Sequence, residues 1–206
     1  MTIHHEKKLI FIHIPKNAGT SIIKAMECVH NFYIDKTLPE YKEHYKEYWN
    51  TYNKFAVIRD PIDRFISAYK FARMKESGWF SATGEENLEK HHHYDICNSM
   101  NINEYVDYIF NHPKELNRWI VPQSWIISDE DNQIEIDTLI RYENLLEDLQ
   151  KIKIDNIQKL NTSKIEDESL IQLTKKSKIL LSQIYNIDYI NFHYQKPVSS
   201  LSYQYK

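Results

Sequence analysis

A run of small, hydroxylated and basic residues near the start of the chain stands between two apolar segments. It reads Pro15-Lys16-Asn17-Ala18-Gly19-Thr20-Ser21 and is called the Lys16 loop below. Residues 8–14 before it are β-branched and aromatic, which predicts a buried strand, and residues 20–29 have the apolar spacing of a helix. Because amides at the start of a helix lack intrahelical partners, they favour an anion. The Lys16 loop therefore predicts a phosphate-binding turn.

The residue types within the Lys16 loop fit that chemistry. Gly19 would let the backbone turn closely around a phosphate. Thr20 and Ser21 would add hydroxyl donors, and either of them could cap the helix. Lys16 would bring a positive charge on a flexible side chain. An ordinary strand-to-helix turn, in which Gly19 serves only the geometry, is the alternative.

A second basic cluster follows the next apolar run. Residues 54–59 predict a strand that ends at Arg59, and the helix after it carries Ser67 two turns along. Ligands of parallel sheets bind at the loops that follow the carboxyl ends of the strands. Arg59 and Ser67 could therefore bind one phosphate from two sides. A structural ion pair of Arg59 with Asp60 or Asp63 is the alternative.

The remaining segments indicate how these clusters are positioned. Asp60 and Pro61 would open a helix through about residue 74, and residues 136–141 predict a third strand. Residues 76–98 are irregular and are interpreted as a long loop or lid. Strands that alternate with helices predict an α/β sandwich with a mainly parallel sheet. Helical patterns recur near residues 41–49, 102–110, 143–152 and 170–185, with a short terminal element at 187–194.

Composition narrows the class of protein. The chain has 206 residues, of which 42% are hydrophobic, as expected for one soluble domain. The formal net charge of −3 favours neither nucleic acid nor an anionic membrane, so an anionic cofactor needs a local cluster of donors. Cys28 and Cys97 have no metal-ligand or disulfide spacing, which indicates free thiols. Because no apolar run suits a signal peptide or membrane span, we expect a cytoplasmic protein; its oligomeric state is not readable.

Together the two clusters resemble the motifs of sulfotransferases that use 3′-phosphoadenylyl sulfate (PAPS), including carbohydrate sulfotransferases and heparan 2-O-sulfotransferase. In that family a Pro-Lys-x-Ala-Gly-Thr-Ser loop binds the 5′-phosphosulfate end, and an Arg-[Asn/Asp]-Pro-x-x-Arg-x-x-Ser-x-Tyr segment binds the 3′-phosphate. Both patterns match here in order. The resemblance implies a single sulfotransferase-like domain over residues 1–206, a P-loop-like three-layer sandwich whose mainly parallel central sheet is flanked by helices. The PAPS-binding residues that it implies are Pro15, Lys16, Asn17, Ala18, Gly19, Thr20, Ser21, Arg59 and Ser67.

The resemblance also implies a reaction. A sulfuryl group would pass from PAPS to a hydroxyl of a glycan or small-molecule acceptor, without a metal, and Lys16 would stabilise charge on the bridging oxygen. A histidine between the two motifs often serves the family as base. His30, which has the more family-like separation from Arg59, is the first candidate here and His44 the second; either could instead be a surface or packing residue.

Weaker similarities cover other parts of the chain. Residues 122–124 (Pro-Gln-Ser) resemble the family's Pro-Gln segment near the acceptor site, with Trp119 close by. The candidates to stack on sugar faces are Trp79, Phe80, Trp119 and Trp125; Trp79, next to Gly78 in the long loop, is the better one, and Trp125 is expected in the core by default. The run His91-His92-His93 is interpreted as a solvated loop rather than a metal site. Asn17 replaces a commoner threonine, which we expect to leave the loop amides unaffected.

Two other functional classes stay open. The first is a nucleotide-dependent phosphotransferase that uses ATP and magnesium. The Lys16 loop lacks the first glycine of a Walker A motif, its lysine is misplaced for one, and no acidic strand end is evident for magnesium. The second is a non-catalytic module that binds a nucleotide or glycan.

Overall fold

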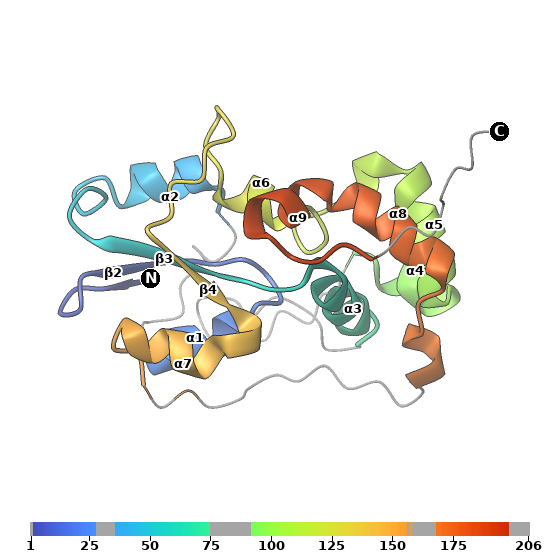
Figure 1. The fold of residues 1–206 in the computed structure, drawn as a ribbon, viewed down its shortest axis with the longest axis horizontal. Coiled ribbons are helices and arrows are strands. Elements are labelled where there is room, and N and C mark those ends of the chain that lie inside the picture. The colour runs from blue at the N-terminus through green and yellow to red at the C-terminus, as the bar shows by residue number, and fades with distance from the viewer. Residues whose placement is uncertain (1, 28–35, 75–91, 156, 158–167, 198–206) are drawn as a thin grey trace.

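A four-stranded sheet lies at the centre of the computed structural model, which describes residues 2–27, 36–74, 92–155, 157 and 168–197 (Figure 1). The strands lie in the order β1-β2-β3-β4; β2, β3 and β4 run parallel, and β1 pairs antiparallel with β2. The mainly parallel sheet is confirmed, whereas the antiparallel edge strand was not predicted. The strands are β1 (Ile3–His4), β2 (Leu9–Ile12), β3 (Asn53–Ile58) and β4 (Thr138–Arg141).

Both faces of the sheet are covered, which explains why β2 and the second half of β3 are continuous apolar runs. In β2, Leu9 and Phe11 pack on one face, and Ile10 and Ile12 pack on the other. Helices α1 and α7 cover the first face, and α2, α6 and α9 cover the second (Figure 1). These helices are α1 (Gly19–Ala25), α2 (Leu38–His44), α6 (Gln123–Ile127), α7 (Leu145–Lys151) and α9 (Asn186–Phe192).

A helical cluster packs beside the sheet around Phe65, Tyr69 and Tyr105. Asp60 caps its first helix by accepting from the amides of Ile62 and Asp63, at 2.9 and 3.0 Å, so the predicted start at Asp60-Pro61 is confirmed. Its helices are α3 (Pro61–Ala72), α4 (Tyr94–Ser99), α5 (Ile102–Asn111) and α8 (Lys175–Ile184), with short 3₁₀ turns at Pro113–Glu115, Tyr142–Asn144 and Glu168–Ile171.

Part of the predicted loop at residues 76–98 is in fact α4. Its helical structure rests on tertiary packing, since Cys97 is fully buried in the helical cluster and short helices have little stability of their own. Residues 75–91 of that predicted loop lie outside the described residues.

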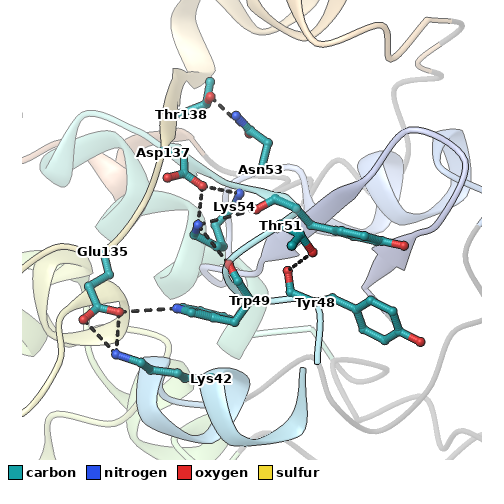
Figure 2. Close-up of polar contacts among 10 residues, drawn as sticks. Lys42, Tyr48, Trp49, Thr51, Asn53, Lys54, Glu135, Asp137 and Thr138 are labelled. Atoms are coloured by element: carbon teal, nitrogen blue, oxygen red, sulfur yellow. Dashed lines mark hydrogen bonds and ion pairs between the residues drawn. The ribbon is translucent and has the colours of Figure 1, made fainter. Parts of the chain in front are cut away.

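Charged residues tie β4 to β3 and α2 at the end where the strands begin. The Asp137 carboxylate lies 2.6 Å from Lys54 Nζ and accepts from the Lys54 amide at 2.7 Å. Glu135 contacts Lys42 of α2 at 2.8 Å and Trp49 Nε1 at 3.4 Å. Figure 2 shows Lys54 between Asp137 and Trp49. These contacts hold β4 against β3 at the opposite end from the residues considered next.

Candidate active site

The Lys16 loop joins β2 to α1 in a conformation set by two left-handed residues. Lys16 has φ 71° and Ala18 has φ 63°, so the loop reverses handedness twice within three residues. Backbone of this kind can direct successive amide groups to one side, where they form a concavity for an anion. Ala18 is the N-cap of α1 and no side chain caps the helix. The prediction that Thr20 or Ser21 would cap it was wrong, because the helix already begins at Gly19.

Gly19 has a structural role beside its predicted role at a phosphate. Its φ lies outside the left-handed region, and a Cβ there would stand 2.1 Å from two ring atoms of His13. His13, at the end of the apolar run, is only 8% exposed. Gly19 is therefore needed because the His13 imidazole lies against its Cα. The sequence signal for this contact was the histidine two residues before Pro15, which was not singled out.

The Lys16 side chain lies in a largely buried, positively charged environment. Its Nζ is 4.0 Å from the centroid of the Phe71 ring, and Phe71 stacks on Trp119 with 4.8 Å between ring centroids. Burial, and then the guanidinium groups of Arg59 and Arg64, lower the pKa of Lys16 from 10.5 to about 7. Lys16 can therefore gain or lose a proton near neutral pH.

Arg59 follows β3 and reaches the Lys16 loop. Its Nη1 donates to the Lys16 carbonyl at 3.2 Å, and its guanidinium lies 4.2 Å from the Tyr142 ring centroid. The Nε of Arg59 is buried and has no hydrogen-bond partner within the described part of the chain. The alternative ion pair with Asp60 or Asp63 is not among its contacts, since the Asp60 carboxylate caps α3 instead. Arg59 thus retains donor capacity beside the loop.

Arg64, the second arginine of the resembling segment, is structural. It is 1% exposed and donates to the carbonyls of Pro15, Val121 and Arg118, at 3.0, 2.7 and 3.2 Å. Such a side chain joins α3 to the Lys16 loop and to residues 118–121, and it has little capacity left for a ligand. The sequence did not reveal this role, because the three carbonyls come from distant parts of the chain.

Asn17 and Gln123 meet beneath the loop. Asn17 is 1% exposed, and its Nδ2 donates to the Val57 carbonyl at 2.6 Å and to Gln123 Oε1 at 2.7 Å. Gln123 is fully buried, so its side chain faces the Lys16 loop and not the surface. The resemblance of residues 122–124 to a segment near the acceptor site stays a prediction. Asn17 can contribute to binding through its backbone, whereas its side chain holds the loop to β3.

The other predicted binding residues have varied surroundings. Pro15 and Ser21 are buried, while Thr20 at the start of α1 and Ser67 on α3 are half-buried. His44 is exposed at the end of α2, with its ring 4.6 Å from that of Tyr45. Their roles toward a ligand stay predictions. His30 and Trp79 lie outside the described residues.

Two expectations about aromatic and histidine residues were wrong. Trp125 is 56% exposed and not part of the core, because the buried face of the short helix α6 is taken by Ile126 and Ile127. His93 is 2% exposed rather than solvated. Its Nδ1 lies 2.6 Å from the Tyr105 hydroxyl, so it belongs to the interior of the helical cluster.

A loop lysine and an arginine at the ends of adjacent parallel strands are typical of α/β proteins that bind anionic ligands. A family model, described as "Sulfotransferase family", matches residues 1–195. The chain belongs to this sulfotransferase family. No curated protein and no solved structure matches the chain significantly.

Two features are absent from the described residues. None of the helices described is both long and apolar enough to cross a membrane. Within the same ranges, no group of three or more His, Cys, Asp or Glu side chains is arranged to hold a metal ion.

Proposed function

We propose that this chain transfers a sulfuryl group from PAPS to an acceptor hydroxyl, and that the Lys16 loop and Arg59 hold the donor within a P-loop-like fold. One observation carries the proposal: Arg59 Nη1 donates to the Lys16 carbonyl across 43 residues of sequence. The two motifs that the family uses for the two ends of PAPS therefore adjoin one another. Membership of the sulfotransferase family supports the type of reaction.

The donor groups present suit a doubly phosphorylated nucleotide. In a chain of net charge −3, Lys16, Arg59 and Arg64 are close enough that the two guanidinium groups lower the pKa of Lys16. A buried Arg59 Nε without a partner in the described chain is a donor that an anion would satisfy. We assign the 5′-phosphate to the amides and hydroxyls of the Lys16 loop, and the 3′-phosphate to Arg59 and Ser67.

Each protein group has a defined task in the transfer. PAPS supplies the sulfuryl group and a phosphate leaving group. The acceptor oxygen forms a bond to sulfur while the bond from sulfur to the bridging oxygen breaks, and the acceptor proton passes to a base. The protonated Lys16 stabilises the charge that develops on the bridging oxygen. We propose His30 as the base and His44 as the alternative; His30→Ala with near-normal turnover would exclude His30.

The surroundings of Lys16 favour an acceptor that carries a ring. Phe71 lies under Lys16 Nζ and stacks on Trp119, which places aromatic faces next to the lysine that would hold the sulfuryl group. Such faces bind the apolar face of a sugar or another ring. A carbohydrate acceptor is the form of the proposal that we favour.

Thermal denaturation with different nucleotides tests the proposal. Adenosine 3′,5′-bisphosphate at 100 times its Kd should stabilise the protein by about 2.7 kcal/mol, since it binds only the folded state. ATP with magnesium should stabilise it far less. A panel of glycans and small hydroxyl compounds, assayed for sulfate transfer from PAPS, then separates an enzyme from a silent binding module. If ATP with magnesium stabilised the protein and adenosine 3′,5′-bisphosphate did not, the proposal would be contradicted.

A further inference from the structure

The side-chain amide of Gln123 joins the two halves of the candidate site. Its Oε1 accepts from Asn17 Nδ2 at 2.7 Å and from the Arg59 amide at 3.0 Å. Its Nε2 donates to the Arg59 carbonyl at 2.8 Å. Gln123 therefore binds both backbone groups of Arg59 and one side chain of the Lys16 loop at the same time.

Asn17 completes the connection on the loop side. Its Nδ2 also donates to the carbonyl of Val57 at 2.6 Å, which lies on β3 two residues before Arg59. The loop is thus attached to β3 directly and through Gln123. These hydrogen bonds are buried. If one of them is broken, its donor and acceptor cannot form a hydrogen bond with water instead, which costs stability.

Asp188 on α9 holds Gln123 in place. Its carboxylate accepts from the amides of Gln123 and Ser124, each at 2.8 Å, and lies 3.5 Å from Gln123 Nε2. Asp188 is fully buried. It caps the start of α6, since the first amides of a helix need acceptors from outside the helix.

We propose that Gln123, held by Asp188, is a positioning residue that sets the distance between the Lys16 loop and Arg59. The inference rests on the proposed function: this distance is the spacing between the two points at which the protein binds the two phosphates of its nucleotide. A ligand with two anchoring groups gains from both only when the two binding points match its own length. The Gln123 amide fits this role because it is inaccessible to a ligand and touches both binding points.

The experiment compares a nucleotide with two phosphates and nucleotides with one. Gln123→Met preserves the length of the side chain and removes its hydrogen bonds. Titration calorimetry would give Kd values for adenosine 3′,5′-bisphosphate, adenosine 5′-monophosphate and adenosine 3′-monophosphate. We expect Gln123→Met to weaken the bisphosphate at least 10-fold and each monophosphate less than about 3-fold, since each monophosphate uses a single binding point.

Two further variants separate positioning from loss of stability. Ile126→Val trims the buried face of the same helix, α6, without altering the hydrogen bonds of Gln123, and should bind all three nucleotides as the wild type does. Gln123→Glu keeps the acceptor, lacks the donor until its carboxyl is protonated, and places that carboxyl beside the buried Asp188 carboxylate, which lies 3.5 Å from Nε2 of the glutamine; this like charge also favours the protonated form. The ratio of its bisphosphate Kd to that of the wild type should therefore shrink as pH falls.

The outcomes distinguish this inference from the proposed function. If the wild type binds the bisphosphate and Gln123→Met binds it equally well, or loses all three nucleotides to the same extent, the positioning role is overturned. If Gln123→Met does not fold, the pH dependence of Gln123→Glu decides, and a constant ratio overturns the inference. If the wild type does not bind the bisphosphate, the proposed function fails as well.

Discussion

Lys16 is a lysine that titrates near neutral pH in the free protein. Its pKa is lowered to about 7 by burial and by Arg59 and Arg64. A bound phosphate dianion favours the charged amine and raises this pKa again. Between pH 7 and the higher pKa of the complex, the complex holds more protons than the free protein. Nucleotide binding should therefore take up a proton in that range.

The first prediction is that affinity for adenosine 3′,5′-bisphosphate falls as pH rises above about 7, approaching 10-fold per pH unit while one proton is taken up. Its phosphates already carry full charge there, since their last pKa is about 6. Calorimetry in buffers of different ionisation enthalpy measures the uptake directly. Lys16→Arg, whose guanidinium stays charged, should abolish it. Equal proton uptake by both proteins would show that another group titrates.

Gly19 leads to a second prediction, because its Cα faces the His13 ring. Gly19→Ala should destabilise the fold by about 1–3 kcal/mol, as expected when an atom is forced into a packed site. In a His13→Ala background the same change should cost far less, because the ring that a Cβ would meet at 2.1 Å is gone. Urea denaturation of the four proteins of this double-mutant cycle measures the coupling. Additive effects would mean that the contact does not restrict position 19.

At the level of elements, the Lys54–Asp137 pair secures β4 at the end of the sheet away from the Lys16 loop (Figure 2). The Lys54 side chain is 13% exposed, so water compensates only partly for its loss of a partner. Asp137→Asn should lower the free energy of unfolding by about 1 kcal/mol with an unchanged Kd for the bisphosphate. Urea denaturation and calorimetry would check the two parts.

An exposed ion pair provides the control for Asp137. Lys46 and Glu43 lie 3.0 Å apart with side chains 68% and 78% exposed. Glu43→Gln should change stability by less than about 0.5 kcal/mol, since exposed pairs contribute little. A nucleotide Kd that changes with Asp137→Asn would mean that the two ends of the sheet are not independent.

Local signals predicted the elements that carry the site, and tertiary contacts account for what they missed. The apolar run before Pro15 and the Asp60-Pro61 pair predicted β2 and the start of α3, because strand burial and helix capping depend on neighbouring residues. The start of α6 was not predictable, since its cap is Asp188, 65 residues from Gln123. The N-cap at Ala18 was not predictable either, because alanine is not a residue type that indicates a left-handed backbone or a helix cap.

The candidate site was predictable only in part for the same reason. Lys16 and Arg59 were identified by residue type at the ends of strands, and the fold places them next to each other. The hydrogen bonds of Gln123 were not predicted, since a glutamine after a proline does not reveal which groups its amide will meet. Burial decides such roles, and burial is a property of the folded chain.

Residues far from the Lys16 loop in the sequence hold the candidate site in place through hydrogen bonds. Arg64 holds carbonyls of the Lys16 loop and of residues 118 and 121, and α9 supplies Asp188. The central sheet, with helices on both faces, brings these segments together at the carboxyl ends of its parallel strands (Figure 1). A chain with an acidic balance overall, 26 basic against 29 acidic residues, thereby concentrates several cations in one place.

The location of Asp188 affects how natural variation in this chain should be interpreted. A substitution there lies almost at the end of the matched family region, outside both signature motifs, and touches no reacting atom. It would nevertheless remove the acceptor for two amides of α6. A survey that scores variants only by their distance from signature motifs would classify such a change as harmless, although it removes buried hydrogen bonds directly beneath the candidate site.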